Sequence, residues 1–429
     1  MPVPDYTRSR AYRAAACTHL PFGVSSTPRG RQSPVPVVIE EAQGVHLTDL
    51  DGNRYIDFTL GYGPLLLGHT PDCVQAAVTR EMARGLRTAT VHRGEAALAD
   101  LLAECVPTAE QTAFVTTGTE AVQLALRIAR AATGRLKIAK FRANYHGWID
   151  NLHVAGTPGN DGACTSGQDP AASADVVLFD WGDAAQVGAL DSSFAAVILE
   201  PAAINPGCFA PPPGFLEAVR VITRKHGIVL IFDEVITGFR LGLGGAQQRY
   251  GVLPDLTVLG KVLGGGLPIG AVAGRRDIMH DVATGRLLHR GTFNGNPLSL
   301  AAGFAAISHL RTYASTLYPR LDVMAAGLSA HVNAQAMRAG VAACAQVVGS
   351  AVQLFVGTKG LTCIDDLTQV DRAETARLTD ALLQRGIYAL PRGLMYLGAP
   401  HDDTDMAATY HALSEALETL RTPPIQQGS

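Results

Sequence analysis

The fold is decided by the stretch IVLIFDEVITGFR, residues 228–240, in which five consecutive apolar residues run directly into a carboxylate. An apolar run without alternation is typical of a strand that is buried on both faces of a parallel sheet. Asp233 then lies at the carboxyl end of that strand, which is the edge where open α/β sheets bind ligands. A carboxylate there needs a cationic or N–H partner, although a helix N-cap or a structural ion pair would explain Asp233 alone equally well.

Outward from this stretch, short apolar runs alternate with helical stretches from about residue 113 to residue 274. We expect strands at residues 113–116, 136–141, 176–179, 194–199, 228–232, 256–259 and 270–273. In a helix expected from residue 121, the polar residues Gln123, Arg127 and Arg130 form one narrow stripe on a mostly apolar surface. The pattern predicts an α/β fold whose large domain has a mostly parallel seven-stranded sheet between helices.

The two flanks of this region have different patterns. Prolines predict irregular structure over the first forty residues, and a small hairpin is expected at residues 45–48 and 54–58. After Pro297 we expect helices at 298–310, 313–334 and 404–420, strands near 347–356 and 387–390, and a frayed tail at 422–429. We therefore divide the chain into an N-terminal segment (1–60) packing on the small domain, a large ligand-binding domain (61–310) and a smaller α+β C-terminal domain (311–429).

Composition excludes several classes of protein. Apolar residues make up 47% of the 429 residues, which is ample for a core, and the length favours two unequal domains. A net charge of −3 leaves no basic excess for nucleic acid, and no stretch predicts a membrane span or a signal peptide. Seven cysteines without a C-x-x-C pair argue against a disulfide framework and a zinc site, so we expect a cytoplasmic protein.

Lysine is rare in this chain, and one lysine has unusual neighbours. It occurs at only five positions, and Lys261 is flanked on both sides by apolar residues and glycines, in LTVLGKVLGGG at residues 256–266. Burying an ammonium there is costly, so either the side chain reaches solvent or its charge is removed chemically, as in a Schiff base. Taken alone, a solvent-reaching lysine at a strand end is the better explanation.

A possible phosphate site precedes the expected helix at residue 121. The residues TTGTE at 116–120 are small or polar, and free N–H groups at a helix N-terminus can hold a phosphate. An ordinary N-cap would explain the same residues. The chain lacks a P-loop, a dinucleotide fingerprint, H-E-x-x-H and G-x-S-x-G. The phosphate turn, Asp233 and Lys261 together indicate pyridoxal phosphate, because its protonated ring nitrogen would pair with the carboxylate and its aldehyde with the lysine.

Six motifs in a fixed order support this interpretation. They are TGTEA at 117–121, YHG at 145–147, LEP at 199–201, FDEVITGFR at 232–240, LGKVLGGGLPIG at 259–270 and GTFNGNP at 291–297. In these motifs the chain resembles class III aminotransferases of pyridoxal-phosphate fold type I, in particular the branch that contains glutamate-1-semialdehyde 2,1-aminomutase. The resemblance runs from about Gly23 to Asp405, which is nearly the whole chain.

The resemblance implies roles for the residues around the cofactor. Lys261 would hold pyridoxal phosphate as an internal aldimine and, once displaced by an incoming amine, would act as the base that moves a proton. Asp233 would keep the ring nitrogen protonated. Tyr145 would stack on one face of the ring and Val235 would pack against the other, while Asn205 would lie near the ring hydroxyl.

Further residues are assigned by the same resemblance. Gly118 and Thr119 would hold the phosphate, and Thr292 would reach the phosphate of a neighbouring subunit, which implies a homodimer with shared active sites. His146 would support Tyr145, or it would be a structural histidine.

The substrate side is assigned less closely. Arg29 matches the family position that binds a substrate carboxylate, and a surface arginine is an equally good explanation. Arg392 is a second candidate anion contact, for which a structural role is slightly favoured. Tyr62 would line the pocket where the aminomutase typically carries tryptophan, and residues 156–173 resemble the mobile lid of that branch.

Two departures from the aminomutase pattern decide the expected reaction. The stretch 388–401 is shorter, with Leu394-Met395-Tyr396 in place of an acidic residue, and the lid differs in length and sequence. We therefore expect an aminotransferase that moves an amino group from an amino donor to a keto or aldehyde acceptor. An intramolecular aminomutase or an amino-acid racemase is the alternative within this chemistry. A catalytically silent binding protein of the same fold is the non-enzymatic alternative, and the presence of both Lys261 and Asp233 argues against it.

Overall fold

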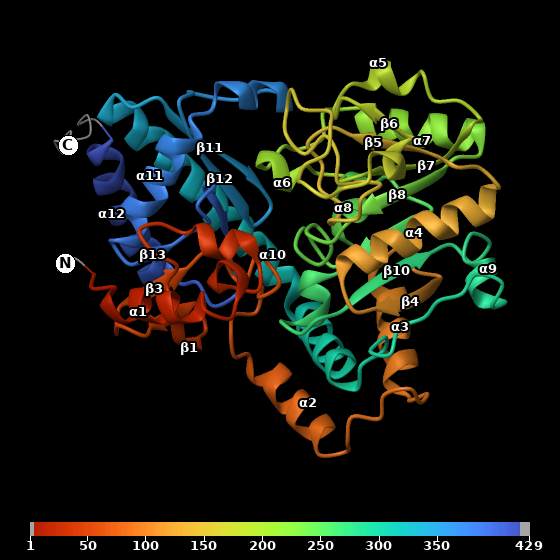
Figure 1. The fold of residues 1–429 in the computed structure, drawn as a ribbon, viewed down its shortest axis with the longest axis horizontal. Helices are drawn as coiled ribbons and strands as arrows, with labels where there is room; N and C mark the ends of the chain where they lie inside the picture. The colour runs from red at the N-terminus through yellow and green to blue at the C-terminus, as the bar shows by residue number, and fades with distance from the viewer. Residues whose placement is uncertain (1–3, 421–429) are drawn as a thin grey trace.

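A seven-stranded sheet forms the centre of the larger part of the molecule, seen on the right of Figure 1, in a computed structural model that describes residues 4–420. Its strand order is β4-β10-β9-β8-β7-β5-β6. The strands are β4 (Gln111–Val115), β5 (Lys137–Phe141), β6 (Val176–Phe179), β7 (Phe194–Leu199), β8 (Val229–Asp233), β9 (Leu256–Leu259) and β10 (Gly270–Gly274). Strand β10 is antiparallel to both of its neighbours, β4 and β9, and all other neighbouring pairs are parallel. The predicted mostly parallel sheet is confirmed, with every expected strand within two residues of its position.

Helices cover both faces of this sheet, which explains the continuous apolar runs of its strands. Helix α4 (Gly118–Thr133) packs on one face, against side chains such as Val229 and Ile231 of β8. Helix α7 (Phe215–His226) packs on the other face, against Leu230 and Phe232 of the same strand. Alternate residues of one strand therefore enter two different cores, as the pleat of a strand requires.

A second part of the molecule, on the left in Figure 1, contains two smaller sheets. A three-stranded antiparallel sheet consists of β11 (Ala343–Val348), β12 (Ala351–Val356) and β14 (Leu394–Tyr396). A four-stranded sheet has the order β1-β2-β3-β13, made of β1 (Ile39–Gln43), β2 (His46–Asp49), β3 (Arg54–Asp57) and β13 (Ile387–Tyr388). Because β3 pairs with β13, strands from the beginning and the end of the chain share one sheet. The domain limits at residues 60 and 310 stay predictions.

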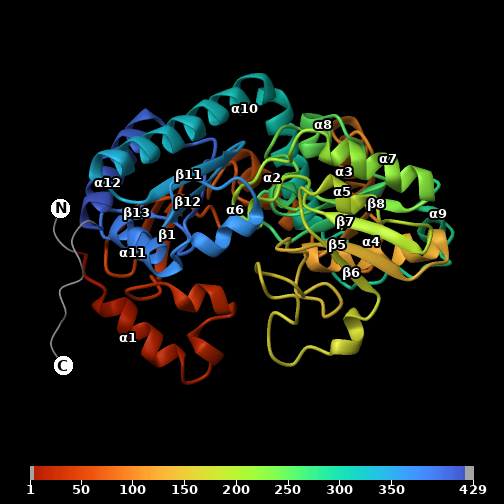
Figure 2. The same cartoon turned by 90° about the horizontal axis from the view of Figure 1, so that it is seen from above.

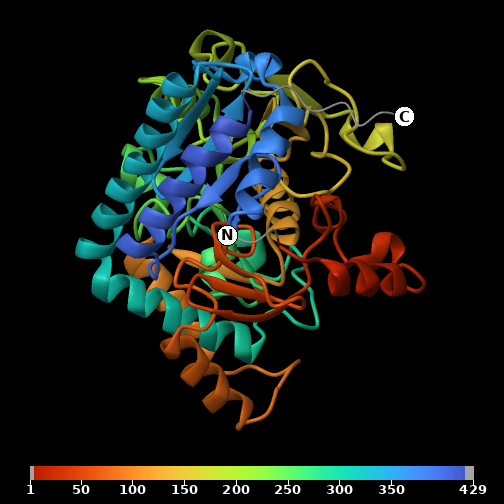
Figure 3. The ribbon, with the colours of Figure 1, turned by 90° about the vertical axis from the view of Figure 1, so that its left-hand side faces the viewer.

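The remaining helices complete the two parts. In Figure 2, α10 passes along one side of the molecule and spans both parts, while α1 and the segment around residues 150–175 project on the opposite side. Helix α2 stands out at the lower end of Figure 3. Their bounds are α1 (Thr7–Ala16), η1 (Pro21–Gly23), η2 (Thr27–Arg31), α2 (Asp72–Met82), α3 (Gly94–Cys105), η3 (Pro170–Ser173), α5 (Ala184–Val187), α6 (Ile204–Gly207), α8 (Gly245–Tyr250), η4 (Lys261–Gly264), α9 (His280–Ala283), α10 (Pro297–Ala339), η5 (Ile364–Gln369), α11 (Arg372–Leu383) and α12 (Asp403–Thr419).

Three expectations about secondary structure were wrong. The helices expected at 298–310 and 313–334 are one helix, α10, of 43 residues, because no residue between them breaks a helix. The single strand expected near 347–356 is a hairpin, in which Gly349 adopts a φ of 55° and turns β11 into β12. The N-terminal forty residues contain α1, which fits in a stretch without proline. The expected tail at 422–429 lies outside the described residues.

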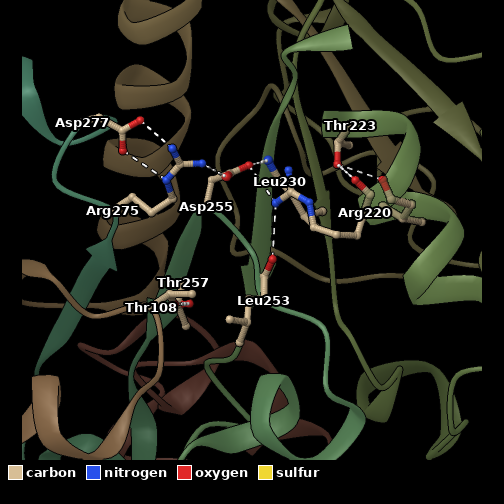
Figure 4. A network of polar contacts seen from close by, with 10 residues as sticks. Thr108, Arg220, Thr223, Leu230, Leu253, Asp255, Thr257, Arg275 and Asp277 are labelled. Atoms are coloured by element: carbon tan, nitrogen blue, oxygen red, sulfur yellow. Dashed lines mark hydrogen bonds and ion pairs between the residues drawn. The ribbon is translucent and has the colours of Figure 1, made fainter. Parts of the chain in front are cut away.

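A buried polar network fixes the amino ends of β8 and β9, opposite the edge that carries Asp233 (Figure 4). The Asp255 carboxylate accepts hydrogen bonds from the Leu230 backbone N–H at 2.8 Å, from Arg220 at 3.0 Å and from Arg275 at 2.9 Å. Two cations and a backbone donor satisfy this buried anion, as a buried charge requires. The network therefore joins the loop before β9 to the start of β8.

Among residues 4–420, none of the helices combines the length and the apolar character that a membrane crossing requires.

Candidate active site

A cavity of about 230 Å³ lies where the carboxyl ends of β8 and β9 meet the amino end of α4. Parallel strands bring residues that are distant in the sequence to this one edge. Its lining residues are Gly118, Thr119, Val122, Tyr145, His146, Gly147, Glu200, Asn205, Asp233, Val235, Ile236, Thr237 and Lys261. The structure therefore brings together most of the site residues named from the sequence: Gly118, Thr119, Tyr145, Asn205, Asp233, Val235 and Lys261.

Lys261 enters the cavity from the first position of η4, directly after β9 and Gly260. Its φ of 44° is uncommon for a residue with a side chain and is retained only where the surroundings fix it. The next two residues, Val262 and Leu263, are buried and anchor the turn. Burial lowers the pKa of the Lys261 amine to about 8, against the opposing charges of Asp233 and Glu200, which favour the ammonium form. A larger fraction of this amine than of an ordinary lysine is therefore neutral and nucleophilic near neutral pH.

Asp233 is paired with His146, for which the sequence left two roles open, support of Tyr145 or a structural role. His146 Nδ1 lies 2.7 Å from Asp233 Oδ2, and both side chains are buried. The other oxygen, Asp233 Oδ1, accepts the backbone N–H of Val235 at 3.1 Å. The Nε2 atom of His146 has no hydrogen-bond partner within residues 4–420. These bonds fix the orientation of the carboxylate toward the cavity.

Glu200 is a site residue to which the sequence motif gave no role. It follows β7 and accepts the Tyr145 backbone N–H at 2.9 Å and the Asn205 backbone N–H and Nδ2 at 3.1 Å each. Burial raises the pKa of the Glu200 carboxyl, and these N–H groups oppose the rise. Glu200 therefore holds two residues of the cavity wall in place. Its signal in the sequence was a carboxylate directly after a buried strand, the same signal that located Asp233.

The amino end of α4 supplies a potential anion site. Thr117 is the N-cap, and it forms a capping box with Glu120, so the helix begins at Gly118 and not at residue 121. The box uses the N–H groups of Thr117 and Glu120, whereas those of Gly118 and Thr119 have no acceptor within the described chain. A Cβ on Gly147 would lie 2.6 Å from Thr119 Oγ1, so a glycine is needed for this close approach. Residues 116–120 can therefore cap the helix and still leave the N–H groups of Gly118 and Thr119 for a phosphate.

Four of the predicted site residues lie outside this cavity. Arg29 and Tyr62 line a second cavity of about 320 Å³ between the N-terminal segment and the residues around β13. Arg392 lines a third cavity of about 400 Å³, and its Nη1 donates a hydrogen bond to the backbone oxygen of Asn205. Thr292 is exposed in the loop before α10.

The segment expected to form a lid lies beside the cofactor cavity. Gly156 and Thr157 line a further cavity of about 200 Å³ together with Tyr145 and His153. The rings of Tyr145 and His153 meet edge to face, with their centroids 6.1 Å apart. Residues 156–169 form no helix or strand longer than isolated bridges. The assignment of this segment as a lid stays a prediction.

The groups around the first cavity match the chemistry of pyridoxal phosphate. The Lys261 amine suits its aldehyde, the Asp233 carboxylate suits a protonated ring nitrogen, and the free N–H groups at the start of α4 suit its phosphate. Gly118 and Val235 approach each other so closely that a Cβ added to the glycine would lie 3.1 Å from a valine methyl carbon. A glycine at position 118 therefore lets the amino end of α4 lie directly against the Val235 side of the cavity. Fold and site together define a transferase of the pyridoxal-phosphate-dependent fold type I.

Comparison with known proteins supports this class. The family model "Aminotransferase class-III" matches residues 27–401, and the chain belongs to that family. Glutamate-1-semialdehyde 2,1-aminomutases are similar over nearly the whole length: that of Rhodopirellula baltica is 38% identical (94% of each chain), and that of Desulforudis audaxviator is 39% identical (96% of this chain, 98% of the relative). The protein is therefore a pyridoxal-phosphate-dependent enzyme of the class III aminotransferases.

Solved structures with the same fold include enzymes named for transamination. An omega-transaminase from Sphaerobacter thermophilus has a TM-score of 0.89 at 35% identity, covering 96% of this chain and 98% of the other. A β-phenylalanine aminotransferase from Variovorax paradoxus has a TM-score of 0.86 at 32% identity, covering 95% and 93%. The similar proteins thus include enzymes named for amino transfer and enzymes named for amino rearrangement.

Proposed function

We propose that this enzyme transfers an amino group between two separate molecules, from an amino donor to a keto or aldehyde acceptor. The observation that carries this choice is the strand β14, whose residues Leu394, Met395 and Tyr396 are buried. They occupy the position at which the aminomutase branch is expected to carry an acidic residue. An aminomutase must keep its intermediate bound until the amino group has moved, and the residue at this position is expected to help. An apolar strand there alters that part of the site, which favours release of a keto product. The relatives from Rhodopirellula baltica and Desulforudis audaxviator are named aminomutases, so intramolecular transfer is the competing reaction, with an amino-acid racemase as a further alternative.

The proposed roles at the reacting atoms follow from the geometry of the cavity. When bound, pyridoxal phosphate supplies an aldehyde that links to amines and a ring that accepts the electrons released when a C–H bond breaks. Lys261 would hold the aldehyde through its Nζ atom and, after displacement by the donor, would move a proton from the substrate carbon to the cofactor carbon that carried the aldehyde oxygen. A pKa of about 8 suits an amine that must accept and release a proton near neutral pH.

The wall residues would orient the cofactor. The Asp233 carboxylate, held by His146 at 2.7 Å, would keep a proton on the ring nitrogen. Tyr145 and Val235 would contact the two faces of the ring, and Asn205 would lie near its hydroxyl.

The anchors for phosphate and substrate would lie around this wall. Gly118 and Thr119 would bind the phosphate through their N–H groups. Arg29, Tyr62 and Arg392 would bind the substrate from the two neighbouring cavities.

A homodimer would complete the site. Thr292 is exposed and lines no part of the cofactor cavity of its own chain, which supports a contact with the phosphate of a second copy. A groove of about 1020 Å³ between α2, α3 and α10, with Phe304 and Tyr313 exposed along it, supports an interface at this face. All seven cysteines are free thiols, which supports a reducing cytoplasm as the location.

Single-turnover mixing tests the proposed function. Cofactor-loaded enzyme is mixed with alanine, β-alanine, β-phenylalanine or 1-phenylethylamine without an acceptor, and the released keto product is measured. Intermolecular transfer predicts one equivalent of keto product per active site from at least one donor. Lys261→Ala should abolish this release, whereas Lys137→Ala, which removes an exposed lysine, should leave it unchanged. Conversion of glutamate 1-semialdehyde to a rearranged amino acid, with no keto product from any donor, would establish the aminomutase instead.

A further inference from the structure

The turn Leu60–Gly63 contains four consecutive residues in the left-handed region. Their φ values are 43° for Leu60, 66° for Gly61, 69° for Tyr62 and 101° for Gly63. Glycines adopt such values without strain, but Leu60 and Tyr62 carry side chains. Strained backbone of this kind persists only where the surrounding structure over-determines it, and it is frequent at functional sites.

The first half of the turn is held by one buried carboxylate at the end of β3. Asp57 Oδ1 accepts the backbone N–H and the hydroxyl of Thr59, both at 2.7 Å, and the Leu60 N–H lies 3.2 Å from both carboxylate oxygens. Asp57 Oδ2 is 2.8 Å from His69 Nε2, so the second carboxylate oxygen also has a side-chain partner. Asp57 is 1% exposed, so water cannot replace these partners.

The second half of the turn is held by a buried arginine. Arg240 Nη2 donates to the backbone oxygen of Gly63, and Arg240 Nη1 donates to Ser350 Oγ at 2.9 Å. The guanidinium also lies over the Tyr396 ring, 4.6 Å from its centroid. No carboxylate within residues 4–420 forms an ion pair with this cation. An unpaired buried cation is costly, so its hydrogen bonds to the turn and to the small sheet must compensate.

Between these two anchors the turn presents Tyr62. Its side chain is half-buried, lines the 320 Å³ cavity with Arg29, and packs in the same apolar cluster as Ile236 of the cofactor cavity. Tyr62 therefore borders the proposed carboxylate site and belongs to an apolar cluster that reaches the wall of the cofactor cavity. We propose that Asp57 and Arg240 are positioning residues, which lock the 60–63 turn so that Tyr62 holds the substrate against the cofactor. This inference rests on the proposed function, because it assigns the turn to substrate selection.

The test uses Asp57→Asn in the cofactor-loaded enzyme, with Asp49→Asn as a matched control. Asp49 is also a buried carboxylate that caps a turn of the same sheet, since it accepts the Asn53 N–H at 2.7 Å and the Tyr55 hydroxyl at 2.8 Å. We expect Asp57→Asn to raise KM for alanine and β-phenylalanine about tenfold or more while kcat stays within about threefold, as loss of ground-state positioning predicts. Asp49→Asn should leave both constants near the wild-type values, and both variants should retain the absorbance of the bound cofactor.

A double-mutant cycle separates positioning from a general loss of stability. If Asp57 acts through Tyr62, then Asp57→Asn should add no further rise in KM in the Tyr62→Ala background. Ser350→Ala, which removes one partner of Arg240 without burying a new charge, should raise KM in the same direction by a smaller factor. Equal effects of Asp57→Asn and Asp49→Asn, or additive effects with Tyr62→Ala, would overturn the inference. A wild-type enzyme that turns over no donor would instead refute the proposed function, and the inference would fall with it.

Discussion

The pKa of the Lys261 amine makes a quantitative prediction about its reactivity in the cofactor-free protein. Burial lowers that pKa from the ordinary 10.5 to about 8. At pH 7 about one tenth of the amine is then neutral, against about 0.03% of an amine with the ordinary pKa, a ratio of about 300. A less basic amine is a weaker nucleophile, which reduces this advantage. The pH of half-maximal reactivity does not depend on that correction, and it should lie near 8.

Competitive acetylation measures this pH dependence. The cofactor-free protein is treated with a trace of acetic anhydride between pH 6 and pH 10, and mass spectrometry gives the acetylation rate of Lys261 at each pH, with Lys225, which lies on α7 outside the cavity, as a lysine that the cofactor should not cover. Reactivity of Lys261 should reach half of its maximum near pH 8 and change little above about pH 9, and added pyridoxal phosphate should protect Lys261 but not Lys225. A tenfold rise per pH unit that continued above pH 9 would refute the reasoning, because it would show an amine that burial does not perturb.

The same experiment tests which group stabilises the ammonium form of Lys261 against the effect of burial. Asp233 is the main group that opposes the lowering of the Lys261 pKa, because its negative charge favours the ammonium form. Asp233→Asn should therefore move the midpoint of Lys261 reactivity to lower pH. Asp277→Asn, which removes an exposed carboxylate beyond the far end of β10, should leave the midpoint unchanged. An upward shift in Asp233→Asn would show that the carboxylate does not act on Lys261 as a charge.

Three further predictions concern activity and stability. His146→Asn should retain the cofactor but lower kcat about tenfold or more, because Asp233 loses its 2.7 Å partner; steady-state kinetics check this. Gly245→Ala should destabilise the protein by about 1–3 kcal/mol in urea unfolding, since its Cβ would meet the buried Glu234 carboxylate and its φ is 65°. Arg29→Ala should weaken donors that carry a carboxylate by about tenfold or more relative to 1-phenylethylamine, and an equal loss for both kinds of donor would indicate a structural role.

The central sheet and its functional edge could be predicted because their signals are local. The apolar run before Asp233 identifies a strand that is buried on both faces, and the residue that follows such a strand must lie at the ligand-binding edge. Lys261 was singled out by apolar neighbours that make its charge costly. Neither residue alone decided the site, and the cofactor was predicted only when Asp233, Lys261 and the turn at residues 116–120 were taken together.

The features that were missed depend on partners far away in the sequence. Arg240 contacts Gly63 and Ser350, which belong to different parts of the chain, so no spacing in the sequence could indicate the contact. The hairpin around Gly349 is an exception, because its strands are adjacent in the sequence and the Gly349-Ser350 pair between two apolar runs is a turn signal that the single-strand prediction overlooked. Glu200 is an intermediate case, since its position after a strand was visible but its hydrogen bonds to Tyr145 and Asn205 were not.

The difference between local and long-range features also affects the choice between amino transfer and amino rearrangement. The sheet edge with Lys261 and Asp233 supplies steps that amino transfer and amino rearrangement share, so similarity there groups the chain with enzymes of both names. What separates the reactions is whether the intermediate is retained, and retention depends on residues that surround the edge without belonging to it. In this chain we propose that those residues are the turn that carries Tyr62 and the buried strand β14; Arg240 contacts the turn at Gly63 and the strand at Tyr396. Substitutions on this connection, more than at the sheet edge, should therefore change which reaction the enzyme performs.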